Sequence, residues 1–155
     1  MQTLRNALQS QLRDEFTKQI PAHQSTAPYP SGKWMRHARI SQDQNYWDHC
    51  RTLDDQEEVL LDENARAANN DYYHLEDLTL SQNCRYLAWT EDTSGSERFN
   101  LWIRDLDSNT QICLSDQNIK WSLAWLDDQH LVYLLGDHAN RPFQIKIHTL
   151  GTSFE

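Results

Sequence analysis

The amino-acid sequence predicts a mainly β protein, a partial β-propeller preceded by an N-terminal α-helix. Three observations support this prediction. Short apolar segments with the period of β-strands recur in a fixed order, and this order repeats after about 45 residues. The first twenty residues differ from the rest because their apolar side chains follow a helical period.

The predicted helix carries an apolar residue at every fourth position: Leu4, Leu8, Leu12, Phe16 and Ile20. Four residues overshoot a full helical turn by roughly 40°, so this stripe winds around the helix. Pro21 predicts the end of the helix, since the residue before a proline is pushed out of helical geometry. We expect the helix to pack on its own domain, because its polar side has too few basic residues for a membrane-surface helix.

Residues 21–33 contain three prolines together with serine, threonine and glycine, which indicates a linker or an extended lead-in. After residue 33 the apolar period changes from helical to two. The sequence therefore predicts an N-terminal helix with a proline-rich lead-in over residues 1–33. An incomplete propeller domain is expected over residues 34–155.

The predicted domain begins with a hairpin. Residues 34–39 and 46–51 are short alternating or aromatic-rich runs separated by a polar turn. A further strand is expected over residues 58–62, and the alanine-containing polar stretch 63–70 fits one short helix. The strands between residues 34 and 62 are expected to form a first partial blade.

A longer unit then appears and recurs. Leu80 and Trp125 are 45 positions apart, and the pair Phe99 and Phe143 is separated by 44. Units of four short strands at this spacing are typical of β-propeller blades, although a meandering β-sandwich is the alternative. The expected strands are residues 78–80, 86–89, 99–103 and 111–114, followed by 123–125, 131–134 and 143–147.

The second unit ends before a fourth strand, so we expect between two and three blades, whereas propellers close with typically four to eight. Open blade edges and one-sided apolar faces would then remain, which favours self-association or a partner chain. The sequence leaves open a non-catalytic interaction module that binds by strand addition, or the remnant of a truncated gene.

Charge and cysteine usage exclude several function classes. The chain has 14 Lys and Arg against 23 Asp and Glu, a net charge of −9. Such a surface repels phosphate backbones and anionic lipid, so we expect no nucleic-acid or membrane binding. The longest apolar run is far shorter than the roughly 20 residues that span a bilayer. With no secretory signal and three widely spaced cysteines, the sequence indicates a cytoplasmic protein with reduced thiols.

The residues contain no recognisable active site. None of the glycines forms the G-x-S-x-G pattern of a hydrolase nucleophile, and Ser94 and Ser96 lie in an expected turn. His37 and His49 could face each other across the first hairpin, yet alternating surface positions explain them better. We therefore expect no catalytic residue, no cofactor and no metal site in this chain.

Several segments in fixed order resemble the propeller domain of the prolyl oligopeptidase family, most closely its oligopeptidase B (protease II) branch. They are EEVLLD at 57–62, DYYHL at 71–75, RYLAW at 85–89, DTSGSERFNLWIRDL at 92–106 and RPFQIKIHTLGT at 141–152. Residues 34–51 and the helix at residues 4–20 also fit the segment before the family's first blade. The family's blades often turn through Pro-Asp-Gly, whereas this chain has Gln82-Asn83-Cys84 and Asp127-Asp128-Gln129.

The resemblance implies a cytoplasmic serine peptidase that cuts short peptides after Arg or Lys. In that family a seven-bladed propeller covers an α/β-hydrolase domain and restricts substrate size. The Ser, Asp and His of the triad belong to the hydrolase domain, so the resemblance assigns no catalytic residue here. The partners it implies are that hydrolase domain and, through it, short basic peptides.

The resemblance also implies one contact between domains. The family's loop that matches Asp92 to Glu97 faces the hydrolase domain, where its acid helps to hold the closed state. Glu97 occupies the position of that acid and is expected to pair with an arginine across the gap. A solvated acid in a turn is the alternative for both Asp92 and Glu97.

Overall fold

The structure is a computed structural model that describes residues 2–153, except for the side chains of residues 2–4, 115–117 and 121. In chain order its elements are α1 (Gln2–Gln19), β1 (His23–Ser25), β2 (Tyr29–Ser31), β3 (Trp34–Ser41), β4 (Asp48–Leu53), β5 (Gln56–Asp62), α2 (Glu63–Ala67), β6 (His74–Leu80), β7 (Tyr86–Asp92), β8 (Phe99–Asp105), β9 (Gln111–Trp125), β10 (His130–Gly136) and β11 (Pro142–Thr149). No helix within this range is long and apolar enough to cross a membrane.

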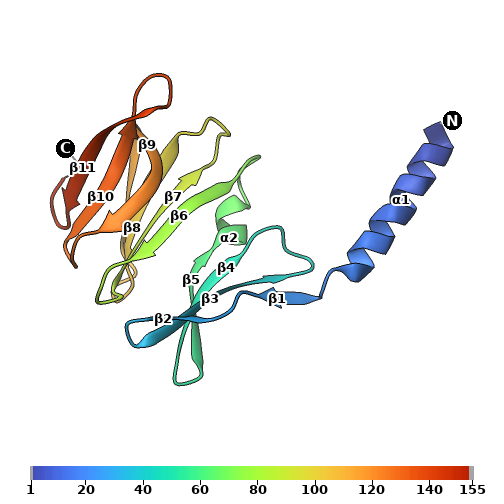
Figure 1. Ribbon diagram of the computed structural model, residues 1–155, viewed down its shortest axis with the longest axis horizontal. Coiled ribbons are helices and arrows are strands. Elements are labelled where there is room, and N and C mark those ends of the chain that lie inside the picture. Colours follow the sequence, from blue (N-terminus) through green and yellow to red (C-terminus); the bar gives the residue numbers. More distant parts are fainter. Residues whose placement is uncertain (1, 154–155) are drawn as a thin grey trace.

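The first sheet, sheet A, contains five strands over the described residues in the order β1-β3-β4-β5, with β2 also on β3 (Figure 1). The predicted hairpin is confirmed, since β3 and β4 pair antiparallel. The lead-in is part of this sheet, because β1 and β2 both pair with β3. The predicted short helix is also confirmed as α2, whose first turn is capped by the Asp62 carboxylate accepting from the Ala65 amide at 2.8 Å.

The second sheet, sheet B, has six antiparallel strands over the described residues in the order β11-β10-β9-β8-β7-β6. The predicted strands of both units are present. One feature differs from the prediction: the last strand of one unit and the first strand of the next are a single strand, β9. Ile119 pairs with Phe99 of β8 on one side and with Leu135 of β10 on the other.

The sheets stack as the blades of a partial propeller, with a core on each face of the middle unit. Leu87 and Trp89 of β7 pack toward Leu60 and Leu61 of sheet A. The other face of the middle unit packs against the last unit through a cluster that includes Ala88, Leu101, Ile119, Leu131 and Tyr133. Because successive strand residues point to opposite faces, β7 is apolar on both sides and buried along most of its length. This confirms the predicted partial propeller.

Arginine and tryptophan side chains line the seam between the sheets. Trp89 and Trp102 stack with ring centroids 5.9 Å apart, and the Arg66 guanidinium lies 4.4 Å from the Trp102 centroid. Arg66 also pairs with the Glu91 carboxylate, which is 2% exposed. Arg51 crosses from sheet A and donates to the Cys84 carbonyl at 2.7 Å. These two tryptophans therefore pack in the seam between the sheets.

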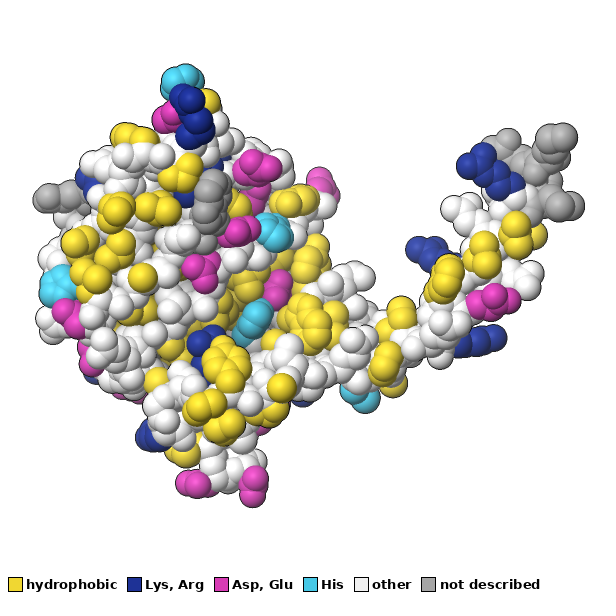
Figure 2. All heavy atoms as spheres, in the orientation of Figure 1, with side chains coloured by type: hydrophobic (Ala, Val, Ile, Leu, Met, Phe, Trp, Pro, Cys, Tyr) yellow, Lys and Arg dark blue, Asp and Glu magenta, His cyan; other side chains and the backbone are white. Residues whose placement is uncertain are grey.

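The N-terminal helix was correctly predicted, but its packing was not. Every described side chain of α1 is exposed, and in Figure 2 its apolar stripe faces open solvent along a separate arm. The side chain of Leu4 lies outside the described part. Among the described side chains, the helix contacts the sheets at its C-terminal end, where Gln42 donates to the Thr17 carbonyl at 2.8 Å. The cause is the direct passage from Pro21 into β1, which pairs at the edge of β3 and directs the helix away from both sheets.

Several turns of the described chain hold non-glycine residues at positive φ. Asp54 and Asp55 join β4 to β5 with φ of 48° and 62°, the geometry of a two-residue type I′ turn. In the 82–84 turn, Cys84 has a φ of 60°. The position where the family often carries glycine therefore keeps its left-handed conformation in this chain, despite the different residue.

Candidate functional site

The loop after β7 is organised by Asp92. Its carboxylate, 1% exposed, accepts hydrogen bonds from the amides of Ser94 at 2.8 Å, Gly95 at 3.0 Å and Glu97 at 2.8 Å. Burial alone would raise the pKa of Asp92, but these hydrogen bonds outweigh it and lower the pKa below the ordinary value. The Asp92 carboxylate thus stabilises the conformation of its own loop.

The same loop presents the Glu97 side chain outward. Glu97 has a φ of 58°, and its backbone is fixed at both ends: the amide donates to Asp92, and the carbonyl accepts from the Lys120 ammonium at 2.6 Å. Its side chain is exposed, and no ion pair within the described part of the chain engages its carboxylate. The structure therefore brings Asp92 and Glu97 together through the backbone and leaves the Glu97 carboxylate available to a partner.

A pocket of about 280 Å³ lies beside Glu97. Three acids contribute to its wall, against one histidine, His74, which is 2.8 Å from the Glu76 carboxylate. The full lining is Tyr72, His74, Glu76, Asp92, Glu97 and Phe99. Aromatic walls and an excess of carboxylates suit a cationic side chain such as arginine.

Sequence reasoning missed the second loop of this surface. Asp137 repeats Asp92 after 45 positions and has the same function, accepting from the amides of Ala139 at 2.8 Å and Arg141 at 3.0 Å. The two loops are tied together by Asn140, which accepts from Lys120 at 3.1 Å and donates to the Ser96 carbonyl at 3.4 Å. The 45-residue repeat was the signal that identifies Asp137.

The serines of the first loop are turn residues, as expected. Ser94 Oγ donates to Asp92 at 2.8 Å and lies 2.7 Å from Ser96 Oγ. Both hydroxyls are thereby engaged within the loop. This matches the structural interpretation of Ser94, Gly95 and Ser96.

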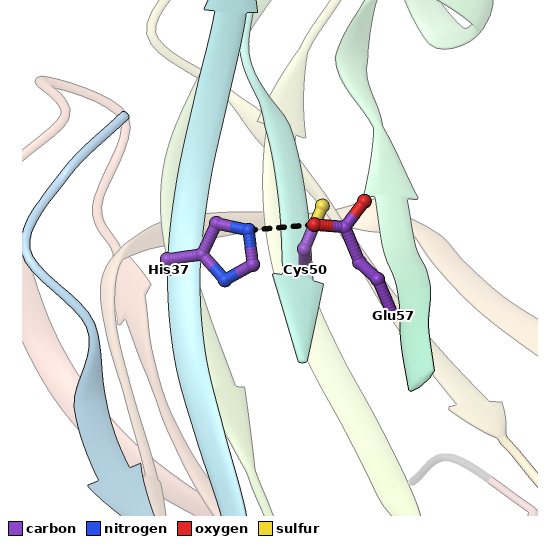
Figure 3. Close-up of side chains that lie close together, drawn as sticks. All are labelled: His37, Cys50 and Glu57. Atoms are coloured by element: carbon purple, nitrogen blue, oxygen red, sulfur yellow. Dashed lines mark hydrogen bonds and ion pairs between the residues drawn. The ribbon is translucent and has the colours of Figure 1, made fainter. Parts of the chain in front are cut away.

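A second group of chemically active side chains lies on sheet A. His37 of β3, Cys50 of β4 and Glu57 of β5 converge, and His37 Nε2 is 2.9 Å from Glu57 Oε2 (Figure 3). Burial raises the pKa of the Cys50 thiol. His37 lies opposite Cys50 in the register and His49 lies opposite Ala38, so the two histidines do not face each other across the hairpin.

The chain matches the family described as "Prolyl oligopeptidase, N-terminal beta-propeller domain" over residues 2–155. Among curated relatives, dipeptidyl aminopeptidase BI of Pseudoxanthomonas mexicana is 28% identical over 94% of this chain. Protease 2 of Moraxella lacunata is 27% identical over 94%. The match covers 23% of each of these relatives, so the chain spans about a quarter of their length.

Solved structures show the same fold. Oligopeptidase B from Leishmania major superimposes with a TM-score of 0.80 at 24% identity, covering 96% of this chain and 23% of that protein. Oligopeptidase B from Trypanosoma brucei, in a closed form with covalently bound antipain, gives a TM-score of 0.76 at 21% identity, covering 90% and 21%. The stacked blades and the match along the whole described chain agree with the resemblance found in the sequence. This chain belongs to the prolyl oligopeptidase family, in which it corresponds to the N-terminal portion of the β-propeller domain.

Proposed function

We propose that this chain is the first part of the propeller of an oligopeptidase B-like serine endopeptidase. The complete enzyme would hydrolyse short peptides after Arg or Lys, with the propeller restricting substrate size. The family match over residues 2–155 carries this proposal, and relatives named Protease 2 and oligopeptidase B support the peptidase class. In this proposal the catalytic Ser, Asp and His come from an α/β-hydrolase domain, so the chain is not catalytic alone.

Reconstitution tests the proposal. The 155-residue chain is mixed with a separately expressed remainder of an oligopeptidase B, and cleavage of arginyl, lysyl and prolyl chromogenic peptides is measured. We expect cleavage after Arg and Lys to require both parts, with the chain alone inactive. Activity of the chain alone, cleavage after Pro only, or no gain on mixing would contradict the proposal.

For the surface beside β7, we propose that Glu97 pairs with an arginine of the hydrolase domain while Asp92 positions the loop. The acidic pocket and the exposed Glu97 carboxylate support this assignment. An exposed ion pair of this kind contributes about 0.2–1 kcal/mol, so Glu97→Gln should weaken association by about 1.4- to fivefold. Asp43→Asn, in an exposed turn of sheet A, removes the same charge elsewhere and should change nothing. If both variants weakened association equally, net charge alone would explain the effect and the proposed pairing would be overturned.

The open edge of sheet B supports a second candidate, association through β11. Phe143, Ile145 and Ile147 alternate along this strand and are 65%, 67% and 58% exposed. An apolar strand at a sheet edge favours pairing with another strand. Light scattering should then give a mass above that of one chain, and Ile145→Lys should return it to the monomer. A monomeric parent chain would exclude this candidate.

We also propose a cytoplasmic location. Cys50 and Cys84 are buried and form no disulfide, which suits a compartment that keeps cysteines reduced.

A further inference from the structure

Three neighbouring strands of sheet A place a histidine, a cysteine and a glutamate on one face. His37 of β3 pairs directly with Cys50 of β4, while Glu57 of β5 pairs with Thr52, two residues beyond Cys50. Residues two apart on a strand share a face, so the three side chains point the same way. The next residue, Arg51, points to the opposite face, toward Cys84 in the turn between β6 and β7. The group therefore lies on the face of sheet A turned away from sheet B.

The donor atoms of this group are near the spacing of a tetrahedral metal site. His37 Nε2, Cys50 Sγ and a Glu57 carboxylate oxygen all lie within 4.8 Å of one another. Around zinc, bonds of about 2.0–2.3 Å put neighbouring ligand atoms roughly 3.3–3.6 Å apart. Moving to that spacing requires shifts of about 1 Å, which the Glu57 side chain, 37% exposed, can supply. Figure 3 shows the Cys50 sulfur beside the Glu57 carboxylate that faces His37.

One cation already lies at the group: the Arg39 guanidinium hydrogen-bonds the Cys50 side chain, so a bound metal has to displace it. Arg39 Nη2 lies 3.3 Å from Glu57 and 3.8 Å from Asp48, so one guanidinium serves two carboxylates. Asp48 Oδ1 is buried and has no hydrogen-bond partner within the described residues. With a neutral His37 the group carries one net negative charge, and a divalent cation that displaces one thiol proton brings it to zero. Arg39, half exposed, can then pair with Asp48 alone.

We propose that His37, Cys50 and Glu57 form a binding site for Zn²⁺ or a similar borderline divalent metal. The imidazole, thiolate and carboxylate are all common zinc ligands, and water completes the tetrahedron. On binding, the Cys50 S–H bond breaks, its proton passes to solvent, a metal–sulfur bond forms, and the metal keeps its oxidation state. The metal joins β3, β4 and β5 across the first hairpin. This site is independent of the proposed peptidase function.

Cobalt(II) is the probe, because a thiolate bound to it gives a charge-transfer absorption in the near ultraviolet. The untagged 155-residue chain, reduced and free of metal, is titrated with Co²⁺ and then with Zn²⁺. We expect a thiolate band that saturates at one Co²⁺ per chain and disappears when Zn²⁺ displaces the cobalt. A titration without this band overturns the proposal.

Variants assign the ligands. Cys50→Ser should abolish the band, whereas Cys113→Ser, at an exposed cysteine on β9, should keep it. A band that survives Cys50→Ser or that Cys113→Ser removes would overturn the assignment. Cys50 is 1% exposed, so its replacement can impair folding. Glu57→Gln leaves the buried thiol in place and should lower cobalt affinity by roughly 10- to 100-fold and shrink the Zn²⁺-induced rise in Tm. Unchanged affinity in Glu57→Gln would also contradict the site.

Discussion

The Lys120 side chain crosses Gly136 so closely that a Cβ on Gly136 would lie 2.3 Å from Lys120 Cε. Lys120 is fully buried, and its ammonium donates to the Glu97 carbonyl at 2.6 Å and to Asn140 at 3.1 Å. The absence of a side chain at Gly136 thus lets one lysine bind both the β7–β8 loop and the β10–β11 loop. The surface that presents Glu97 depends on this crossing.

Gly136→Ala should destabilise the chain by about 1–3 kcal/mol, because the added methyl forces the lysine stem out of its path. Chemical denaturation measures the loss. The matched experiment is a double-mutant cycle with Lys120→Met, which removes the constrained ammonium. Additive effects of the two changes would show that the crossing is not the cause.

Replacing Asp92 by Asn should lower stability at neutral pH by about 1–3 kcal/mol, because an amide cannot accept all the hydrogen bonds that the carboxylate receives. The folded-state pKa of Asp92 is depressed, so its stabilising contribution is complete above the ordinary carboxyl pKa of 3.8 and lost as pH falls below it. The free energy of unfolding, measured from pH 7 to pH 3, should therefore fall less steeply with decreasing pH in Asp92→Asn than in the parent chain. Asp43→Asn is the control. A pH dependence of the free energy of unfolding as steep in Asp92→Asn as in the parent would contradict the assignment.

Asp55→Gly should stabilise the chain by about 0.4–1 kcal/mol. Asp55 has a φ of 62° in the β4–β5 turn, a conformation that glycine adopts without steric cost. Asp43→Gly, in a turn with ordinary φ, should give no gain, because there glycine only adds freedom to the unfolded chain. Thermal unfolding of the two variants compares them directly, and equal shifts would exclude backbone strain as the reason.

Removing the Arg66 side chain should cost about 3–5 kcal/mol, since it leaves the buried Glu91 carboxylate without its cation. Arg66→Ala combined with Glu91→Gln should recover part of that loss. Near-ultraviolet circular dichroism gives a local readout, because Arg66 lies over the stacked pair Trp89 and Trp102. An unaltered tryptophan signal in Arg66→Ala would contradict this description of the seam.

The repeat was predictable because the same hydrogen bonds recur along it. Leu106 donates to Arg85, and 44 positions later Leu150 donates to Gln129, each at 2.9 Å. The apolar pattern follows from these fixed positions, so strand order could be derived from the sequence. The continuity of β9 could not be derived from the sequence, since the alternation of side chains is the same in one long strand as in two shorter strands.

Prediction was weakest where side chains from separate strands meet. His37 lies opposite Cys50 because of the pairing register and the turn length, and the β4–β5 ladder adds an irregularity between His49 and Cys50. A shift of one residue would move these side chains to the other face. The exposure of α1 could not be predicted from the sequence either, because an apolar stripe on a helix indicates burial without indicating which surface covers it.

A strand that is shared by two blades alters how the chain unfolds. Arrays of separate repeats can lose their terminal units one at a time, because each repeat ends before the next begins. Here β9 is the hydrogen-bonding partner of both β8 and β10, so loss of β9 opens the middle and last blades together. Amides of β8 and β10 should consequently exchange with solvent at a common opening free energy, as one cooperative unit.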